Sequence, residues 1–306
     1  MNLTNSTSTT YYPIFNKTKE PLVIIDTVNS FFTYYYSALR IYNRSHHLDN
    51  NTPLCVNKTG KWWPLTKSEI KIFNNFLSIF EGLFNRAILK IKNVTNCYQR
   101  NIIFAIDCPR SEIWRSDILR DEKTNITSYK STRTTRSDIG IPSTLKYLYD
   151  TLLPKYNYQR IGVSKAEADD IIGILTHFVN HYSPNRPVFI ISDDSDFIQL
   201  LMYKNNNLYT QRLNNVRNKI KHSPRKLLEM KIIQGDRIDN IDSAFPKIGP
   251  KRSLNLINNP ELFQKKIDKF GDEKLKRNRL LIDLSYIPNY IKGQVLEKVF
   301  ILKTIL

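Results

Sequence analysis

The sequence has few of the residues that build disulfide-stapled or zinc-bound domains. It contains three cysteines, Cys55, Cys97 and Cys108, and no Cys-x-x-Cys pair among its 306 residues. An odd number of unclustered cysteines disfavours a disulfide framework and a structural zinc site. His177 and His181 have the i, i+4 spacing of a zinc pair. However, no glutamate follows the first histidine and no third ligand is apparent, so a packing role is the better interpretation.

Negative charge and long apolar runs are also scarce. The chain has 46 Lys and Arg residues against 28 Asp and Glu residues, a formal net charge of +18. This excess indicates a polyanionic partner, or else an anionic membrane surface. No stretch approaches the roughly 20 apolar residues that a membrane-spanning helix needs, and the start, MNLTNSTSTT, lacks the features of a signal peptide. We therefore expect a soluble, cytoplasmic protein with no membrane partner.

Acidic residues are concentrated in one stretch, Ile161 to Leu200, despite the basic background. The second of two acidic groups there follows the apolar run at 188–191, which reads as a buried strand, a turn and a helix. Two earlier apolar runs end in the same way, at Asp26 and Asp107. If these strands are parallel neighbours, their carboxylates lie side by side at the edge where open α/β sheets bind ligands. The six acids of the stretch are Glu167, Asp169, Asp170, Asp193, Asp194 and Asp196.

Carboxylates that lie this close together need a counter-charge, because like charges raise one another's pKa. An oxygen-only ligand set without His or Cys favours Mg²⁺ or Mn²⁺. Each acid also has a purely local explanation. Glu167 fits a capping box with Ser164, and Asp236 and Asp239 could be turn formers. The coincidence of all these acids is what favours a metal site.

The order of apolar and polar stretches indicates an α/β domain followed by a helical region. Residues 1–20 are polar and aperiodic, which predicts a disordered leader. Apolar residues at helical spacing predict a long amphipathic helix over Thr66–Lys92, and a second helix is expected over Pro224–Gly235, with the glycine as C-cap. We place the α/β domain, a central mainly parallel sheet flanked by helices, at 21–215 and a helical domain at 216–306.

Two basic segments lie on either side of the acidic groups. Residues 109–141 combine seven Arg and Lys residues with Trp114 and Tyr129, and residues 212–226 contain six basic residues and no acid. Basic residues mixed with aromatics suit phosphate neutralisation and base stacking, and a solvated surface is the alternative. The stretch IGPKR at 248–252 places Gly and Pro ahead of a helix, which makes a good phosphate seat.

With these stretches in order, the chain resembles the flap endonuclease and 5′–3′ exonuclease family, particularly its phage members. The resemblance implies a PIN-like, resolvase-like nuclease domain with a helical arch at about 109–141, and a C-terminal domain of the helix-hairpin-helix type that binds duplex DNA. The matching motifs, which span almost everything after residue 20, are LVIID ending at Asp26, IIFAID ending at Asp107, YKSTR at 129–133, EADD at 167–170, IISDDSDFIQL at 190–200, QGDRIDN at 234–240, IGPKR at 248–252 and LLIDLSYIP at 280–288.

The resemblance implies a metal-dependent phosphodiesterase of DNA replication or repair that acts on 5′ ends, flaps and RNA primers. The expected substrates are DNA with 5′ flaps or ends and RNA/DNA duplexes. A single-strand-binding protein or other replication factors are candidate partners, and the chain is expected to be a monomer. Two Mg²⁺ ions, replaceable by Mn²⁺, are the implied cofactors, with K⁺ as a candidate at the hairpin turn before the IGPKR motif.

The resemblance also assigns roles to individual residues by position. Lys130 and Arg133 match the catalytic pair that contacts the scissile phosphate, and Tyr129 matches an aromatic that stacks on the substrate end. The metal ligands would be Asp26, Asp107, Glu167, Asp169, Asp170, Asp194, Asp196, Asp236 and Asp239. The nucleic-acid contacts would be Arg115, Tyr129, Arg136, Arg217, Lys219, Lys221, Gly249, Lys251 and Arg252.

Three features depart from the family pattern, and two other functions compete. Asp193 is an extra acid, so the register assigns Asp194 and Asp196 to the metal site and leaves Asp193 beside it. The chain is longer between Trp114 and Tyr129, and it has DSAFPK where the family often has a Gly-rich hairpin. A PIN-like ribonuclease shares acids at strand ends, but it would be shorter and would not need the GDRIDN motif. A non-catalytic, structure-specific DNA-binding protein is disfavoured because so many clustered carboxylates are electrostatically costly without metal.

The position of Lys251 leads to a prediction about binding. Because a lysine at a helix start contacts phosphate and not base edges, Lys251→Ala should weaken duplex binding equally for all sequences. Fluorescence anisotropy with duplexes of unrelated sequence would measure this, and native affinity should fall steeply with salt. A loss confined to some sequences would contradict the assignment.

Overall fold

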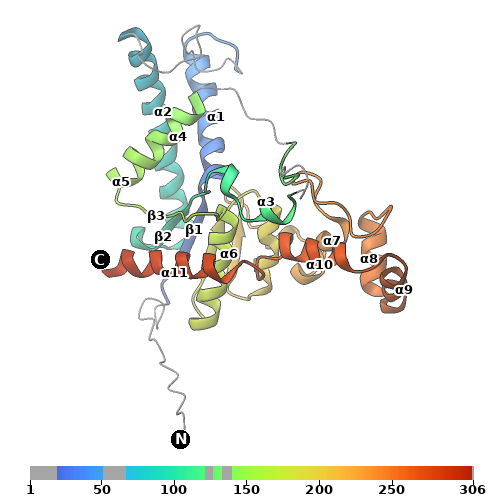
Figure 1. Ribbon diagram of the computed structural model, residues 1–306. Coiled ribbons are helices and arrows are strands. Elements are labelled where there is room, and N and C mark those ends of the chain that lie inside the picture. The colour runs from blue at the N-terminus through green and yellow to red at the C-terminus, as the bar shows by residue number, and fades with distance from the viewer. Residues whose placement is uncertain (1–18, 51–66, 121–126, 133–139, 305–306) are drawn as a thin grey trace, which may run out of the picture.

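A sheet of five parallel strands organises the fold (Figure 1). The computed structural model describes residues 19–50, 67–120, 127–132 and 140–304. The strand order is β3-β2-β1-β4-β5, so the predicted α/β class with a mainly parallel sheet is confirmed. The strands are β1 (Leu22–Asp26), β2 (Ile102–Ala105), β3 (Gln159–Ile161), β4 (Val188–Ile191) and β5 (Asn206–Tyr209).

The central strand β1 fixes the geometry of the sheet edge. Ile25 is paired with Phe104 of β2 on one side and with Ile191 of β4 on the other. The three acid-delivering strands are therefore adjacent and in register, as the sequence predicted. Their β-branched, apolar residues suit strands that are buried on both faces. Strands β2 and β3 lie on one side of β1, and β4 and β5 lie on the other. The border between β1 and β4 is therefore the topological switch point, where such sheets bind ligands.

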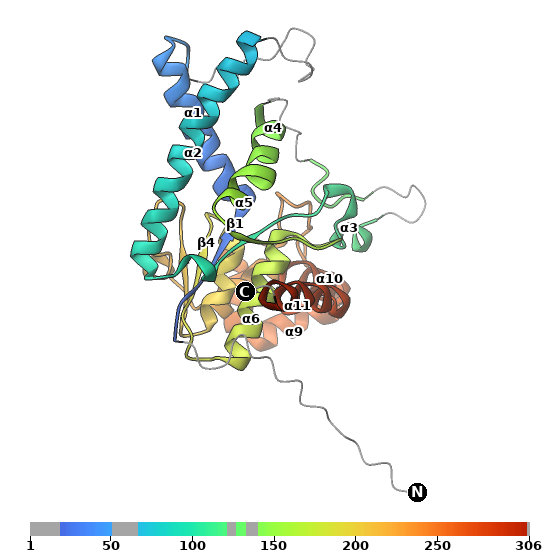
Figure 2. The same cartoon turned by 90° about the vertical axis from the view of Figure 1, so that its left-hand side faces the viewer.

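The first face of the sheet is covered by α1 (Thr27–Ser45), α2 (Lys67–Thr95), α4 (Gly140–Tyr147) and α5 (Leu153–Lys155), with a π-helical turn at Leu148–Leu152. Phe76, Phe80 and Phe84 lie fully buried along α2, so the predicted amphipathic helix is confirmed and ends three residues later than expected. Figure 2 shows α1 and α2 extending together well beyond the sheet.

The second face is covered by α6 (Ala168–Tyr182) and α11 (Asn289–Thr304). Ile24 and Ile190 point to this side, whereas Val23 and Ile25 point to the first face, as strand alternation requires. Figure 1 shows α11 running beneath the sheet. The last helix of the chain therefore packs on the sheet although it follows the helical region in sequence.

A mainly helical region follows β5. It contains α7 (Pro224–Gln234), α8 (Pro250–Asn258), α9 (Pro260–Phe270) and α10 (Glu273–Ile282), after a 3₁₀ turn at Arg217–Lys219. The predicted helix from Pro224 is confirmed, and Gly235 caps it with a φ of +72°. α7 packs against α8, α10 and the 3₁₀ helix Ser195–Met202 that follows β4. One edge of this region thus lies against the acidic segment.

Some of the sequence predictions fall outside the described residues. These are the leader at 1–18, residues 121–126 and 133–139 of the arch segment, and with them Arg133 and Arg136. The described parts of the arch segment contain one 3₁₀ turn, Arg110–Glu112, the helix α3 (Arg115–Ile118) and the first residues of α4. No helix within the described ranges is long and apolar enough to cross a membrane.

Gly235 should be irreplaceable for the fold, because a Cβ there would lie 2.3 Å from the Ile241 carbonyl oxygen and its φ is positive. We expect Gly235→Ala to lower the free energy of unfolding by about 2 kcal/mol or more, measured by urea denaturation. Gly293→Ala is the control, since a Cβ there meets nothing within 4 Å and α11 should gain about 0.5 kcal/mol. Equal effects of the two substitutions would contradict this account.

Candidate active site

The three strand-end carboxylates meet at the carboxyl edge of the sheet. Asp26 caps α1 by accepting a hydrogen bond from the Asn29 amide at 3.2 Å, and it also accepts one from the Ser192 hydroxyl at 2.8 Å. Asp107 accepts from the Ala168 amide at 2.7 Å, at the start of α6. Because helix N-termini favour negative charge, the local structure holds these carboxylates in place before any ligand binds.

The acids of the EADD stretch at 167–170 differ in whether they line the pocket. Glu167 and Asp169 line the pocket, whereas Asp170 is fully buried and does not. Asp170 accepts hydrogen bonds from the Glu167 amide at 2.9 Å and from the Trp114 indole at 3.0 Å, and its other oxygen lies 2.8 Å from the Arg115 guanidinium. Asp170 thus has internal partners and does not line the pocket, although no hydrogen bond reaches its Oδ1 among the described residues. Its role as a metal ligand stays a prediction.

The segment after β4 contributes Asp194 and Asp196. Asp194 accepts a hydrogen bond from the Asp196 amide at 2.8 Å and so begins the 3₁₀ helix. Asp193, which the sequence placed outside the ligand set, is exposed and accepts from the Gln211 amide at 3.1 Å. The register that assigns the site to Asp194 and Asp196 thus agrees with their place in the pocket lining.

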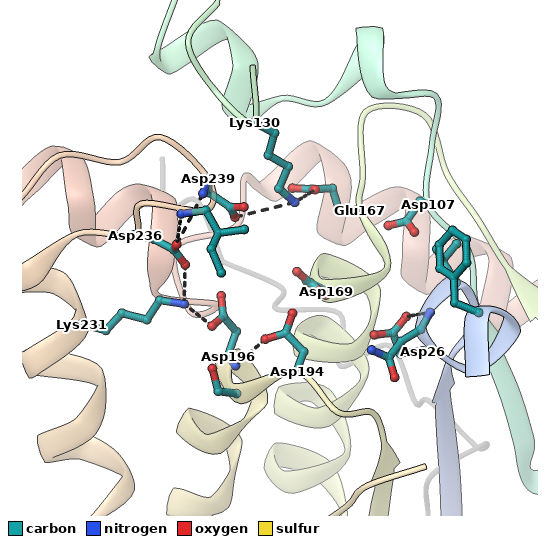
Figure 3. Close-up of a pocket in the computed structure, with 15 residues that line it drawn as sticks. Asp26, Asp107, Lys130, Glu167, Asp169, Asp194, Asp196, Lys231, Asp236 and Asp239 are labelled. Carbon is teal, nitrogen blue, oxygen red and sulfur yellow. Dashed lines mark hydrogen bonds and ion pairs between the residues drawn. The ribbon is translucent and has the colours of Figure 1, made fainter. Parts of the chain in front are cut away.

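The helical region supplies the remaining acids. Asp236 and Asp239 lie on the turn after α7, where the Asp236 carboxylate accepts from the Ile238 amide at 2.8 Å. The Asp239 carbonyl oxygen accepts from the Lys130 amide at 3.1 Å. The Asp236 side chain therefore shapes the turn, as its local explanation predicted, and it also faces the pocket (Figure 3).

Together these groups line a pocket of about 350 Å³. Two lysines point into it from opposite sides, Lys130 from the base of the arch segment and Lys231 from α7 (Figure 3). Lys130 pairs with Glu167, and Lys231 pairs with Asp196 and lies 2.8 Å from Asp236. The eight carboxylates that line the pocket are Asp26, Asp107, Glu167, Asp169, Asp194, Asp196, Asp236 and Asp239.

The electrostatics of the pocket follow from burial and from these partners. Asp26 is 7% exposed, and burial together with the nearby Asp107 carboxylate raises its pKa to about 7. Burial alone would also raise the pKa of Glu167, but Lys130 and Arg115 outweigh it and lower the pKa. The part of the pocket around Asp26 therefore lacks positive charge, whereas the part around Glu167 has it.

The donor set fits a hard divalent cation, because it consists of carboxylate oxygens alone. The raised pKa of Asp26 shows the shortage of positive charge that such an ion would relieve. Among the described residues, however, no three His, Cys, Asp or Glu side chains are gathered closely enough to hold one ion. The carboxylates would have to draw together around a bound metal.

Three predicted nucleic-acid contacts have partners inside the protein. Arg115 is 3% exposed, pairs with Glu167 and Asp170, and donates to the Leu281 carbonyl at 2.9 Å. Tyr129 is 5% exposed and donates its hydroxyl to Glu167 at 2.9 Å. Arg217 donates to three backbone carbonyls, those of residues 201, 203 and 206.

The other predicted contacts that can be placed are accessible. Lys219, Lys221, Lys251 and Arg252 are exposed, and Gly249 is half-buried at the N-terminal cap of α8. None of them lines the acidic pocket. These residues are therefore available to a ligand that extends away from the pocket, while Arg133 and Arg136 lie outside the described residues.

Six residues that line the pocket were missed from the sequence: Val28, Asn29, Phe32, Ser195, Lys231 and Ile238. Lys231 stands in a helix of a lysine-rich chain, where no spacing distinguishes it from a solvated lysine. Phe32 lines the pocket from α1, next to Val28 and Asn29. Its place could have been inferred from helical spacing, because Phe32 lies one turn after Val28 and Asn29 on the same face of α1.

Comparison with known proteins places this geometry in context. The family model of the 5′–3′ exonuclease N-terminal resolvase-like domain matches residues 21–229. Ribonuclease H of Enterobacteria phage T4 is 26% identical over 232 residues, which is 70% of this chain and 74% of the relative. A 5′–3′ exonuclease of Halalkalibacterium halodurans is 28% identical over 155 residues, 46% of this chain and 48% of the relative.

Solved structures share the fold. The D15 protein of T5 crystallised with metal ions has a TM-score of 0.59 and 18% identity, and the alignment covers 92% of this chain and 99% of that one. A complex of the bacteriophage T5 D15 flap endonuclease with DNA and metal ions also has a TM-score of 0.59, with 17% identity, 94% of this chain and 99% of that one.

The raised pKa of Asp26 predicts an inverse relation between stability and pH in the metal-free protein. Because the folded state binds this proton more tightly than the unfolded state, the stability that Asp26 contributes is fully present below about pH 4 and is lost as pH rises through about 7. Asp26→Asn removes the titrating group, so at pH 8 in EDTA it should be more stable than the native chain by roughly 2 kcal/mol.

Thermal unfolding of both proteins between pH 4.5 and 8 would measure this difference. Mg²⁺ should stabilise the native chain more than the variant, because the variant lacks one carboxylate of the pocket. If Asp26→Asn were less stable than the native chain at pH 8 without metal, the electrostatic account of Asp26 would be wrong.

Proposed function

We propose that this chain, which belongs to the 5′–3′ exonuclease family with a resolvase-like N-terminal domain, is a structure-specific 5′ nuclease that hydrolyses phosphodiesters with two Mg²⁺ ions. The observation that carries the proposal is the convergence of eight carboxylates and two lysines on one pocket at the switch point of a parallel sheet. Such a concentration of oxygen ligands suits a pair of divalent ions and the phosphate between them.

In this proposal the acids of the pocket hold metal, and the basic residues contact the phosphate. Asp26, Asp107, Asp169 and Asp194 would hold metal on the sheet side, and the acids of the GDRIDN turn would complete the set from the helical side. Bound Mg²⁺ would lower the pKa of the attacking water and stabilise the leaving oxygen. Lys130 enters the pocket from the arch base, where its ammonium group can offset charge that develops on the phosphate. We propose the same role for Arg133.

Substrate recognition would rest on the exposed basic residues beyond the pocket. Lys251 and Arg252 lie in the first turn of α8, where the helix N-terminus favours phosphate. Lys219 and Lys221 add positive charge on the segment before α7. Contacts of this kind bind duplex backbone without reading sequence. We propose that residues 21–215 form the nuclease domain and residues 216–306 the duplex-binding domain, which also contributes Lys231, Asp236 and Asp239 to the pocket.

The names of the relatives support the substrate classes. A ribonuclease H relative and a flap endonuclease neighbour favour RNA primers and 5′ flaps, in addition to 5′ ends of duplex DNA. We propose that Mn²⁺ substitutes for Mg²⁺, that K⁺ binds at the turn before α8, and that the chain acts as a monomer in the cytoplasm, that of a host if the chain is viral. A single-strand-binding protein or other replication factors are the proposed partners.

The two competing functions fit the molecule less well. A PIN-like ribonuclease would not need the turn at 236–241 or the basic helices after it. A non-catalytic DNA-binding protein would have to keep Asp26 buried among carboxylates without a metal, which is electrostatically costly. The nuclease function is therefore the better explanation.

Cleavage of a 5′-labelled flap duplex tests the proposal. We expect cutting with Mg²⁺ and none with EDTA, and Asp194→Ala should lower the rate by roughly a thousandfold or more, because one carboxylate that would hold metal is lost. Asp193→Ala is the matched control, since this neighbouring acid bonds to the Gln211 amide instead of lining the pocket. Its rate should stay within about twofold of native.

Tight, salt-sensitive binding of the flap without any cutting would favour the DNA-binding alternative. Cutting of single-stranded RNA in preference to the flap would favour the ribonuclease alternative. Equal losses from the two substitutions would contradict the assignment of Asp194 over Asp193.

A further inference from the structure

The acids of the pocket fall into two sets, according to whether they have a lysine partner. The paired set is Glu167 and Asp239, which contact Lys130, and Asp196 and Asp236, which contact Lys231. The unpaired set is Asp26, Asp107, Asp169 and Asp194. Within the described ranges, no Lys or Arg nitrogen lies within 4.0 Å of a carboxylate of this second set. The two lysines of the pocket thus form their ion pairs with one set of acids, although Lys130 also lowers the pKa of Asp169 through space (Figure 3).

Lys231 occupies the position of a bridging cation. Its Nζ contacts Asp196 Oδ1 and lies 2.8 Å from Asp236 Oδ2, so one ammonium group joins the segment after β4 to the turn after α7. Burial lowers the pKa of Lys231, but the two carboxylates outweigh burial and raise the pKa above its ordinary value. The ammonium group therefore stays charged, and it satisfies oxygens that a metal would need.

Lys130 also joins two carboxylates, but its second contact is longer than that of Lys231. Its Nζ contacts Glu167 Oε1 and is 3.7 Å from Asp239 Oδ2. Its backbone amide donates to the Asp239 carbonyl, which holds the lysine over the pocket at a φ of +54°. The two lysines together are paired with four carboxylates, and among the described residues no three acids are gathered around one point.

We propose that Lys231, assisted by Lys130, acts as a resident counter-ion that occupies the helical-side half of the proposed metal site, so that a second divalent ion binds there only by displacing an ammonium group. This inference rests on the proposed metal site. Its consequence is an ordered loading of the pocket, in which the unpaired set binds the first ion readily and the paired set binds the second ion weakly. Once displaced, the Lys231 ammonium is free to pair with a phosphate oxygen.

Direct metal titration without DNA tests the proposal. The probe is Mn²⁺ binding to the full chain, followed by the electron paramagnetic resonance signal of the free aquo ion. The native chain should show one tight and one weak class of sites. Lys231→Met removes the charge but keeps an unbranched side chain, so the weak class should tighten at least roughly fivefold, since an ion pair no longer competes for it.

Two further variants make the test specific. Lys226→Met, on the same helix, removes a lysine that contacts only Asn258 among the partners described, and it should leave both classes of Mn²⁺ sites unchanged. Lys231→Arg keeps the charge and offers a bidentate fork to carboxylates, so it should fold and weaken the second class. The two substitutions at one position thus have opposite expected effects.

Several results would overturn the inference. These are an unchanged or weakened second class in Lys231→Met, the same tightening in Lys226→Met, or no Mn²⁺ binding by the native chain. If Lys231→Met did not fold, native-like or tighter binding in Lys231→Arg would overturn it. Native flap cleavage with no effect of Lys231 on Mn²⁺ affinity would reject this inference alone. Competition by Lys231 without any cleavage would reject only the proposed function.

Discussion

Repulsion among carboxylates at one edge of a parallel sheet is the constraint on which the rest of the molecule depends. Asp26 cannot move away from this edge, because it ends the central strand and caps α1. The neighbouring strands bring Asp107 and Asp194 to the same place. Like charges at such a site are stable only if cations approach. Lys130 and Lys231, from two segments that are distant in sequence, pair with some of these carboxylates. A bound metal would neutralise the others.

A buried ionic network shows how much of the basic charge is used inside the protein. Arg115 joins Glu167 and Asp170 at the start of α6, and Tyr129 and Trp114 donate to the same two carboxylates. Buried charges are costly unless each finds its partners, so this network fixes the described parts of the arch segment against α6. Arg115 and Tyr129, two residues that the sequence assigned to nucleic acid, are here structural supports of the pocket.

The pocket also joins the two parts of the chain. The turn at 236–241 receives Lys130 through its backbone amide, and Thr132 donates to the Asn240 side chain at 2.8 Å. Lys231 links α7 to the segment after β4. The lining of one cavity therefore comes from the sheet edge, the arch base and the helical region.

The sequence by itself determined the sheet class, the main helices and the acids of the pocket, because buried strands, amphipathic helices and caps are local patterns that depend on neighbouring residues. Strand-end position was enough to find Asp26 and Asp107. Only the tertiary structure decided which charged residues face the pocket. Asp170, Arg115, Tyr129 and Arg217 turn towards internal partners, and Lys231 turns towards the acids. Ion pairs between residues far apart in the chain leave no periodic signal, so packing alone determines them.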